Sequence, residues 1–219
     1  AYKAGSGEIT WLEALERMAR KGKPVLLATG ASTIGEVQQA VHAITAINRE
    51  LVLMQCNTNY TGTLENIKNV NLNVLKTYAV MFPDVVLGLS DHTPGHATVL
   101  GAVALGARVV EKHFTDDTTR EGPDHPFAMD PDTWAKMVEN TRQLEAALGS
   151  ADKVVAENEK DTVVIQRRCI RAARDLTAGE VIAREDISVL RPATPGAILP
   201  NEIKAVIGTK VLSDLPKGK

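Results

Sequence analysis

Short apolar runs alternate with amphipathic segments along the first two thirds of the chain. Unbroken apolar runs of about four to eight residues are typical of strands covered on both faces, whereas apolar residues three and four positions apart indicate a helix. Each of five apolar runs is followed by a segment of the helical kind. The pattern predicts strands at residues 1–4, 25–29, 51–55, 85–89 and 108–111.

The helical segments carry start and stop signals. Thr33-Ile34-Gly35-Glu36 matches a capping box, in which the threonine and glutamate side chains satisfy backbone N–H groups of the first turn. Gly22, followed by Pro24, ends the first helix. We expect a buried, almost wholly apolar helix at 96–105 and a long last helix at 131–148.

Strand, loop and helix in repetition predict parallel βα units, so the expected fold class is α/β. Polar and glycine-rich residues gather just after each strand, where the active sites of parallel α/β folds lie. Five units are too few to close an eight-stranded barrel. From the pattern alone, a partial (β/α)8 TIM barrel and a doubly wound open sheet both fit the chain.

The rhythm of the sequence changes near residue 150. Residues 151–162 are polar and charged, which indicates a linker with a short helix. This linker separates an α/β domain at 1–150 from a small β-rich domain at 163–219. The elements expected in the small domain are strands at 169–173 and 187–190 and a short helix near 200–207.

Composition narrows the functional classes. Lys and Arg number 25 against 27 Asp and Glu, and this net charge of −2 argues against a dedicated nucleic-acid binder. No apolar run approaches the ~20 residues that a membrane span needs. Cys56 and Cys169 have no metal-binding spacing, and we interpret them as free thiols of a cytoplasmic protein. Since the chain lacks an initiator Met and stops in a turn-like segment, we expect a fragment of a longer protein.

Two of the five histidines stand at the ends of successive predicted strands, His92 after the fourth and His113 after the fifth. The carboxyl ends of neighbouring parallel strands meet at one edge of a sheet, and imidazole is a common ligand of divalent metals. We therefore predict that both histidines bind Mn²⁺ or Mg²⁺. The alternative is that one makes hydrogen bonds and the other packs. His96 is expected to pack in its helix, and His42 to lie on a helix surface.

Small polar residues in the strand-to-helix loops indicate an anion site, because they let backbone N–H groups and helix N-termini face a ligand. These residues are Ser6, Gly7, Thr29, Gly30, Ser32 and Ser90. Lys3 lies in a short apolar segment that ends at this site, so phosphate is its natural partner; the alternative is a lysine at a frayed terminus. Glu8 and Asp124 are expected on the same face, where a carboxylate can bind sugar hydroxyls or move protons.

Seven motifs, in this order, resemble one enzyme family. They are YKAGSGEI, LLATGAS, QCNTNY, LSDHT, EKHFT, GPDH and LRPA. Together they are similar to the N-acylneuraminate (sialic acid) synthases, and the tail resembles the antifreeze-like, or SAF, domain of these enzymes. The resemblance covers essentially the whole chain. It implies a TIM barrel, of which this chain supplies the last five βα units, followed by a SAF domain.

The resemblance implies a role for individual residues. His92 and His113 match the two histidines that bind Mn²⁺ or Mg²⁺. Groups that hold the phosphate and carboxylate of phosphoenolpyruvate match Lys3, Ser6 and Ser90, together with Asn57 or Asn59, because Thr58 stands near where many relatives carry Asn. Groups near the amino-sugar or the metal-bound water match Glu8, Tyr60 and Asp124.

The implied reaction joins phosphoenolpyruvate to the open-chain aldehyde of an N-acyl mannosamine-type sugar. It gives a sialic, or nonulosonic, acid and releases phosphate. The metal would polarise the aldehyde, and Glu8 would orient or deprotonate the attacking water. Arg191 matches a SAF-domain arginine that reaches the active site of the partner subunit, which implies a domain-swapped homodimer.

Two other interpretations stay open at this point. The first is another phosphoenolpyruvate-condensing or aldolase-type TIM-barrel enzyme, which would differ in its sugar substrate and in phosphate release. The second is a non-catalytic sugar-binding protein, in which the small second domain does the binding. A pure binder has no need for paired histidines at two strand ends.

Overall fold

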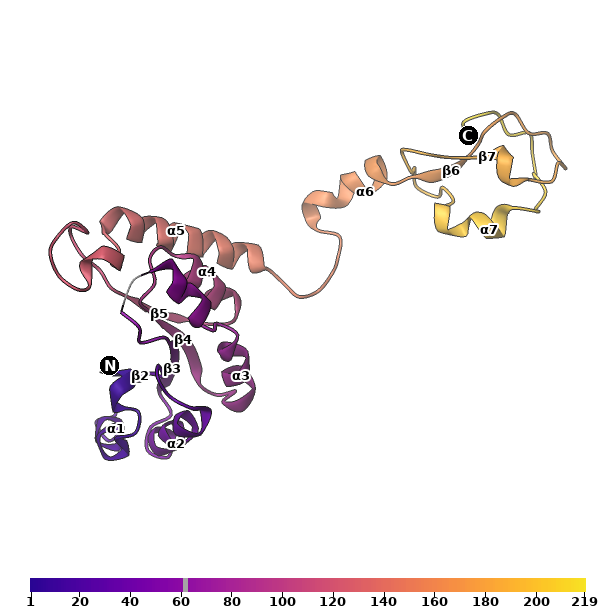
Figure 1. The fold of residues 1–219 in the computed structure, drawn as a ribbon. Helices are drawn as coiled ribbons and strands as arrows, with labels where there is room; N and C mark the ends of the chain where they lie inside the picture. The colour runs from indigo at the N-terminus through magenta and orange to yellow at the C-terminus, as the bar shows by residue number, and fades with distance from the viewer. Residues whose placement is uncertain (61–62) are drawn as a thin grey trace. The chain divides into compact units, whose positions relative to one another are not determined.

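The computed structural model describes residues 1–60 and 63–219, which form two compact units, Ala1–Gly149 and Ser150–Lys219 (Figure 1). Each unit has its own hydrophobic cluster. The division falls near residue 150, where the alternation of apolar and amphipathic segments ends.

The first unit is built on a parallel five-stranded sheet. Its strands are β1 (Tyr2–Ala4), β2 (Val25–Ala28), β3 (Leu51–Cys56), β4 (Val86–Asp91) and β5 (Val109–Lys112). The spatial order is β1-β2-β3-β4-β5, the same as the order in the chain. A doubly wound sheet reverses its strand order at one point, so this order excludes that alternative. The described residues form a curled half-barrel.

Helices cover the sheet on its outer side (Figure 1). They are α1 (Leu12–Ala19), α2 (Ile34–Thr45), α3 (Val74–Met81), α4 (Ala97–Ala104) and α5 (Pro131–Leu148), with short 3-10 turns η1 (Ser6–Glu8), η2 (Leu64–Asn69) and η3 (His125–Phe127). Large side chains of both layers, such as Leu15, Ile44, Leu53 and Leu89, are fully buried in one cluster. Their removal from water is the main force holding the layers together.

Local signals in the sequence account for the helix ends. Thr33 accepts a hydrogen bond from the Glu36 N–H, and the Glu36 carboxylate accepts one from the Thr33 N–H at 2.7 Å, so the predicted capping box is confirmed. A second box joins Asp130 and Thr133 at the start of α5, whose predicted bounds are also confirmed. Gly22 follows α1 with a φ of 63°, which a glycine adopts without strain.

Three strands, β3, β4 and β5, are longer at their carboxyl ends than the sequence predicts. β4 includes Ser90 and Asp91, which pair in register with Glu111 and Lys112 of β5. The prediction that Ser90 lies in a loop is therefore wrong. In the sequence, polar residues mark the end of the apolar run and so the expected end of the strand. Here Asp91 has a buried partner in Lys112, and the backbone pairing of β4 with β5 continues through both residues.

The second unit is small and rich in turns. It contains η4 (Glu157–Glu159), α6 (Lys160–Gln166), η5 (Arg184–Asp186), η6 (Pro200–Glu202) and α7 (Ile203–Val206). β6 (Cys169–Ala172) pairs with β7 (Ile187–Leu190) in antiparallel fashion. α6 begins inside the segment that was predicted as a linker and continues beyond residue 162.

An internal repeat organises the second unit. The pattern Asp-Leu-x-x-Gly occurs at 175–179 and again at 214–218. Leu176 and Leu215 exchange backbone hydrogen bonds of 2.9 and 2.8 Å, so the two copies pair with each other. The final glycine of each copy has a positive φ, 88° and 84° respectively.

The two aspartates of this repeat make equivalent contacts. The Asp175 carboxylate accepts from the Lys217 N–H at 2.7 Å, and the Asp214 carboxylate accepts from the Ala178 N–H at 2.8 Å. Each aspartate therefore closes the turn of the other copy, and the pair of turns has an approximate two-fold arrangement.

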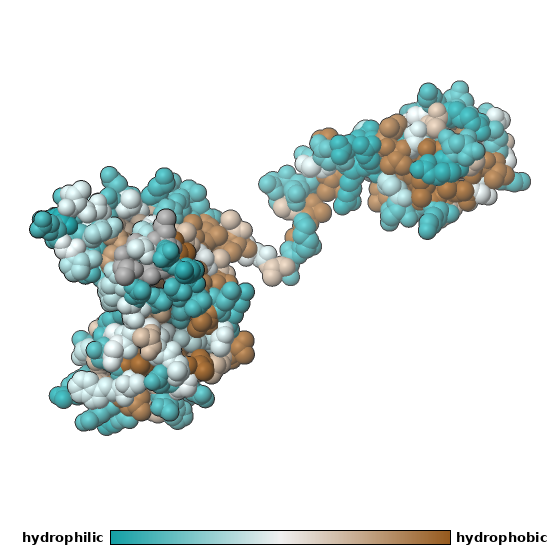
Figure 2. All heavy atoms as spheres, viewed as in Figure 1, coloured by the Kyte–Doolittle hydropathy of each residue, from teal (hydrophilic) through white to brown (hydrophobic). Residues whose placement is uncertain are grey.

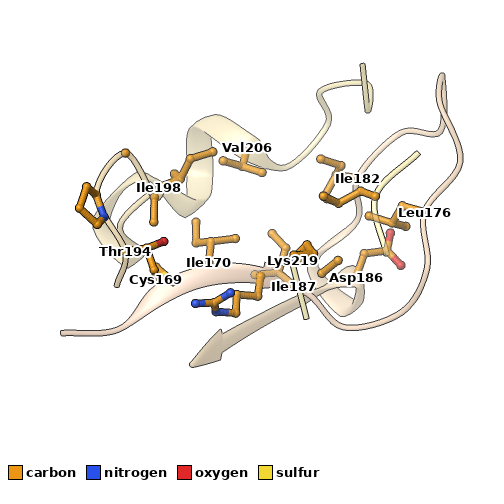
Figure 3. A pocket seen from close by; sticks show the side chains of 16 residues that line it. Cys169, Ile170, Leu176, Ile182, Asp186, Ile187, Thr194, Ile198, Val206 and Lys219 are labelled. Carbon is orange, nitrogen blue, oxygen red and sulfur yellow. The ribbon is translucent and has the colours of Figure 1, made fainter. Parts of the chain in front are cut away.

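A cavity of about 490 Å³ lies between α7 and the two-stranded sheet (Figure 3). Ile170, Ile187, Ile198 and Val206 line much of it. Figure 2 shows brown, hydrophobic atoms among the teal ones on the surface of this unit, and its exposed large hydrophobic side chains include Val154, Ile165, Val181 and Leu212.

Candidate functional site

A cavity of about 520 Å³ lies at the carboxyl ends of the strands of the first unit. The predicted site residues that line it are Lys3, Ser6, Gly7, Tyr60, Ser90 and His92. They come from β1, β4 and the loops that follow β1, β3 and β4. The sheet thus brings together polar side chains that are up to 89 positions apart in the chain, as expected for parallel strands.

The two strand-end histidines converge beside this cavity. The ring centroids of His92 and His113 are 5.1 Å apart, with their planes at 55°. Among the residues that the structure describes, no group of three or more His, Cys, Asp or Glu side chains gathers in a metal-binding arrangement. A cation held by the two imidazoles would take its remaining ligands from water or substrate oxygens.

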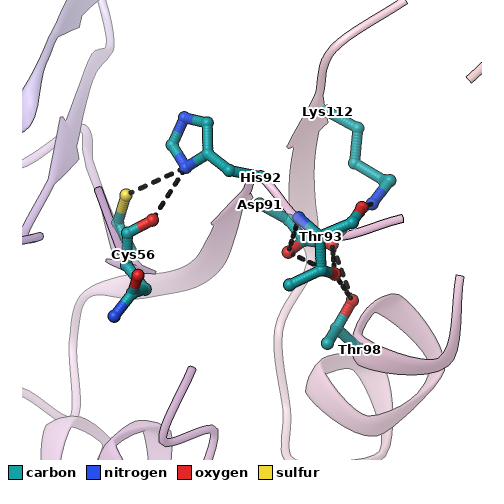
Figure 4. A network of polar contacts seen from close by, with 7 residues as sticks. Cys56, Asp91, His92, Thr93, Thr98 and Lys112 are labelled. Carbon is teal, nitrogen blue, oxygen red and sulfur yellow. Dashed lines mark hydrogen bonds and ion pairs between the residues drawn. The ribbon is translucent and has the colours of Figure 1, made fainter. Parts of the chain in front are cut away.

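The backbone of the loop after β3 fixes the orientation of His92. Its Nδ1 lies 2.9 Å from the Asn57 carbonyl oxygen (Figure 4). Because a carbonyl can only accept, Nδ1 carries the proton and Nε2 keeps its lone pair. Burial lowers the pKa of His92, and this effect outweighs the bond to Asn57. A neutral imidazole with a free Nε2 is the form that binds a divalent metal.

His113 is held among an acid and two aromatic rings. Its Nδ1 lies 3.5 Å from a carboxylate oxygen of Asp124. Phe127 packs against it at 5.0 Å between centroids, and Tyr60 contacts both histidines, at 4.2 Å from His92 and 5.7 Å from His113. The structure thus brings Asp124 and Tyr60 to the histidine pair.

Lys3 has a partner that the sequence did not indicate. Its Nζ lies 2.8 Å from the Glu111 carboxylate, and Glu111 also lines the cavity. Burial acts to raise the pKa of Glu111, but hydrogen bonds from Lys3 and Ser90 and the charge of Lys3 outweigh it, and the pKa is lowered. The Glu111 carboxylate is therefore charged at neutral pH, and Lys3 is held by this ion pair rather than frayed.

Glu8 and Ser6 lie in the turn after β1. A Cβ atom at Gly5 would lie only 2.8 Å from the Glu8 carboxylate, so this carboxylate folds over Gly5, which lines the cavity. The Ser6 hydroxyl accepts a hydrogen bond of 2.9 Å from the Gly30 N–H. Ser6 therefore ties the turn after β1 to the turn after β2.

The asparagines after β3 shape their own loop. The Asn57 side chain donates to the Asn69 carbonyl at 3.1 Å and accepts from the Asn59 N–H at 3.1 Å. Asn57 also supplies the carbonyl that orients His92. Thr58 lines the 520 Å³ cavity, and the two asparagines do not; Asn57 instead lines a neighbouring cavity of about 690 Å³.

Three further residues named in the sequence analysis have defined surroundings in the structure. The Thr29 hydroxyl has partners within the protein: it donates to the Met54 carbonyl and accepts from Tyr78. His42 is exposed on α2, as predicted. His96 stands at the start of α4 and contacts Asn140 of α5 at 2.9 Å.

Both cysteines are free and buried, as predicted. Burial raises the pKa of the Cys56 thiol more strongly than hydrogen bonds from Ser6 and Ser90 lower it, so the thiol keeps its proton at neutral pH. None of the helices in the described part of the chain is both long and apolar enough to cross a membrane.

Arg191 belongs to the second unit. It follows β7, and its Nε donates to the Gln166 carbonyl at 2.6 Å. The rest of its guanidinium is exposed.

The sequence matches the NeuB family over residues 1–153 and the SAF domain over residues 167–219. The chain belongs to the NeuB family. This confirms the family and the two-domain layout inferred from the seven motifs.

Relatives of this NeuB-family chain include synthases of nonulosonic acids. It is 39% identical to an uncharacterised protein of Methanocaldococcus jannaschii, over 98% of this chain and 62% of that protein. It is 37% identical to N,N'-diacetyllegionaminic acid synthase of Legionella pneumophila, over 99% of this chain and 60% of that enzyme. The chain thus spans about three fifths of the length of these relatives.

Solved structures agree with the fold. The crystal structure of N-acetylneuraminic acid (sialic acid) synthetase from Leptospira borgpetersenii, in complex with citrate, matches with a TM-score of 0.67 at 28% identity. The match covers 74% of this chain and 55% of that one.

Proposed function

We propose that this chain forms part of a synthase that condenses phosphoenolpyruvate with an N-acyl mannosamine-type sugar to give a sialic, or nonulosonic, acid and phosphate. The observation that carries the proposal is the convergence of His92 and His113, at 5.1 Å, beside a cavity whose wall includes Lys3. The nonulosonic acid synthases among the relatives of the chain support the same reaction.

The histidine pair suits a divalent cation. The Nε2 lone pair of His92 is available because Nδ1 is committed to the Asn57 carbonyl, and His113 has an acid, Asp124, beside its Nδ1. Two imidazole nitrogen donors, completed by oxygen ligands, fit Mn²⁺, and Mg²⁺ less strongly. A cation bound there supplies Lewis-acid polarisation of the sugar aldehyde.

The residues of the chain itself bind and orient the other reactant. Lys3 offers a positive charge to the phosphate or carboxylate of phosphoenolpyruvate, and charge-assisted hydrogen bonds of this kind are about twice as strong as neutral ones. Ser6 and Ser90 add hydroxyl groups on the same wall. The Lys3–Glu111 contact implies that an incoming anion competes with the Glu111 carboxylate for Lys3.

Glu8, Tyr60 and Asp124 are the residues to which we assign contacts with the sugar and the reacting water. We assign Glu8 the role of orienting or deprotonating the water that adds to C2 of the enol phosphate. Tyr60 packs against His92, Asp124 lies beside His113, and both would contact the amino-sugar. Either Asn57 or Asn59 would complete the contacts to phosphoenolpyruvate from the β3 loop.

Arg191 extends the proposal to the assembly. Its exposed guanidinium would contact the N-acyl arm of the sugar in the active site of a partner subunit. The working enzyme would then be a domain-swapped homodimer in the cytoplasm.

A substrate panel tests this function on the full-length protein. Phosphoenolpyruvate is mixed with unphosphorylated N-acyl mannosamines, their phosphorylated forms and simple aldoses, and phosphate release and product mass are measured. We expect stoichiometric phosphate and a nine-carbon acid from an N-acyl mannosamine-type sugar. Condensation with a simple aldose phosphate would favour another phosphoenolpyruvate-condensing synthase. Sugar binding without phosphate release would favour a non-catalytic protein.

A further inference from the structure

A buried ion pair lies directly behind the two histidines. Lys112 Nζ is 2.6 Å from Asp91 Oδ2, and each side chain is only 1% exposed. Asp91 and Lys112 are cross-strand neighbours and form the last registered pair between β4 and β5. His92 and His113 are the next residues of each strand, so they stand one position beyond the last backbone pairing.

Lys112 also holds the residue on the other side of His92. Its Nζ donates to the Thr93 carbonyl at 2.7 Å (Figure 4). One ammonium group on β5 therefore fixes both Asp91, which precedes His92, and Thr93, which follows it. The residues on both sides of His92 are therefore held by a side chain of β5, the strand that precedes His113.

The remaining lone pairs of Asp91 are used within the same network. Oδ2 accepts from the Thr98 hydroxyl at 2.6 Å, and Oδ1 accepts from the Thr93 N–H and hydroxyl at 3.1 and 2.9 Å. Thr98 lies in the first turn of α4, so the network joins both strands to that helix. Within the described residues, Arg171 Nε is the only buried side-chain nitrogen or oxygen without a partner, so the network is complete.

Tyr60 packs against both rings, and further contacts hold each histidine separately. His92 is anchored to the β3 loop by the Asn57 carbonyl, and the His113 carbonyl accepts from the Met129 N–H at 2.9 Å. Neither contact joins β4 to β5. A buried ion pair is also no better for stability than apolar residues of similar volume. What this pair provides is a fixed distance between two strand ends.

We propose that Asp91 and Lys112 are positioning residues that set the spacing of His92 and His113 for cation binding. The inference rests on the proposed function, since it concerns the same pair of histidines. Groups behind the ligands of a metal typically change its affinity by about 10- to 100-fold when they are removed.

The test compares Mn²⁺ affinity with stability in the full-length protein. The double variant Asp91→Asn with Lys112→Met removes both charges, so neither is left buried alone. We expect its Kd for Mn²⁺, measured by calorimetry or by paramagnetic resonance, to rise about tenfold or more. The KM for phosphoenolpyruvate should change less than about twofold, because Lys3 and Ser6 are untouched. Asp91→Asn alone keeps the shape of the side chain but leaves the Lys112 charge buried without its partner, so it should raise the Kd at least as much.

Leu15→Ala provides the matched control, because Leu15 is fully buried in α1 and far along the chain from the network. It should lower the melting temperature while leaving Mn²⁺ affinity unchanged. Wild-type Mn²⁺ affinity in a folded Asp91→Asn variant, or an equal loss in Leu15→Ala, would overturn the positioning role. A wild-type protein that binds no Mn²⁺ would instead count against the proposed metal, and so the two failures are distinguishable. If the double variant does not fold, Asp91→Asn decides.

Discussion

Lys3 of β1 and Glu111 of β5 meet across the concave side of the sheet, although they belong to its first and last described strands. The sequence indicated Lys3 as an anion-binding residue, but it gave no sign of Glu111. Their contact depends on the curl of the whole sheet, which no local pattern encodes. The same holds for Asp91 and Lys112, whose neighbours His92 and His113 were singled out while they were not.

Replacing Lys3 should weaken the binding of phosphoenolpyruvate. Lys3→Met removes the positive charge that we assign to its phosphate or carboxylate, and a hydrogen bond to a charged group is worth about 1.5–3 kcal/mol. We expect the KM for phosphoenolpyruvate to rise about tenfold or more in steady-state assays of the full-length protein, with little change in the KM for the sugar. Lys23→Met, an exposed lysine outside the cavity, is the control. Equal KM values in Lys3→Met and Lys23→Met would remove Lys3 from the site.

Asp186 should give the second unit a dependence on pH. Hydrogen bonds from the Ala183 N–H, and next from Arg174, hold the pKa of Asp186 below its ordinary value and outweigh the opposing effect of burial. A carboxyl whose pKa is lower in the folded state stabilises above its unfolded pKa, and this contribution is lost as the pH falls through the folded value. The free energy of unfolding should therefore decrease below about pH 4.

Denaturant unfolding of wild type and Asp186→Asn between neutral pH and about pH 3 measures this effect. The variant should be less stable than wild type at neutral pH, and the difference should shrink in acid. Glu185→Gln, at the exposed neighbouring residue, should follow the wild-type curve. A constant difference across the pH range would contradict the assignment.

Among the secondary-structure elements, those with strong local signals were predicted well. Thr33 and Glu36 cap α2 through their own side chains, and the bounds of α5 follow from Asp130 and Pro131 at its start. Strand ends were predicted less well. Ser90 looks like a loop residue in the sequence, but its pairing with Cys56 of β3 and with Glu111 of β5 places it in β4. The parallel order of the strands followed from the repetition of βα units, whereas closure of a barrel depends on more strands than these five.

The repeated turns of the second unit make a prediction at the element scale. Asp175 and Asp214 each accept a backbone N–H from the other copy of the repeat. Asp175→Ala and Asp214→Ala should each lower the free energy of unfolding by about 1 kcal/mol, because each leaves one turn N–H without its acceptor. Because the contacts are equivalent, the two losses should be similar in denaturant unfolding. A loss confined to one variant would show that the two turns are not equivalent in stability.

At the scale of the whole molecule, the two units have separate cores and separate candidate roles. The first carries the histidine pair and its cavity, and the second carries Arg191. The sequence pattern and the packing within one chain do not predict the assembly, because the proposed contact of Arg191 is with a partner subunit. The expectation of a domain-swapped homodimer comes from the family resemblance, and experiments in solution test it.

Arg191→Ala should affect the sugar more than phosphoenolpyruvate. If the guanidinium contacts the N-acyl arm, the KM for the sugar should rise about tenfold while the KM for phosphoenolpyruvate stays within about twofold. Arg167→Ala, an exposed arginine before β6, should behave as wild type. Sedimentation at assay concentration should give a dimer. A fully active monomer would rule out a contribution from a second subunit.

The most direct test of the account is the metal dependence of phosphate release. Full-length protein is assayed with phosphoenolpyruvate and an N-acyl mannosamine after treatment with EDTA, then again after Mn²⁺ is added. We expect activity to disappear and return in the wild type, and to fall about a hundredfold or more in His92→Ala and His113→Ala, since Lewis-acid activation lowers the barrier by several kcal/mol. His42→Ala, on the exposed face of α2, should keep wild-type rates. Phosphate release that persists in EDTA and in both histidine variants would contradict the central claim.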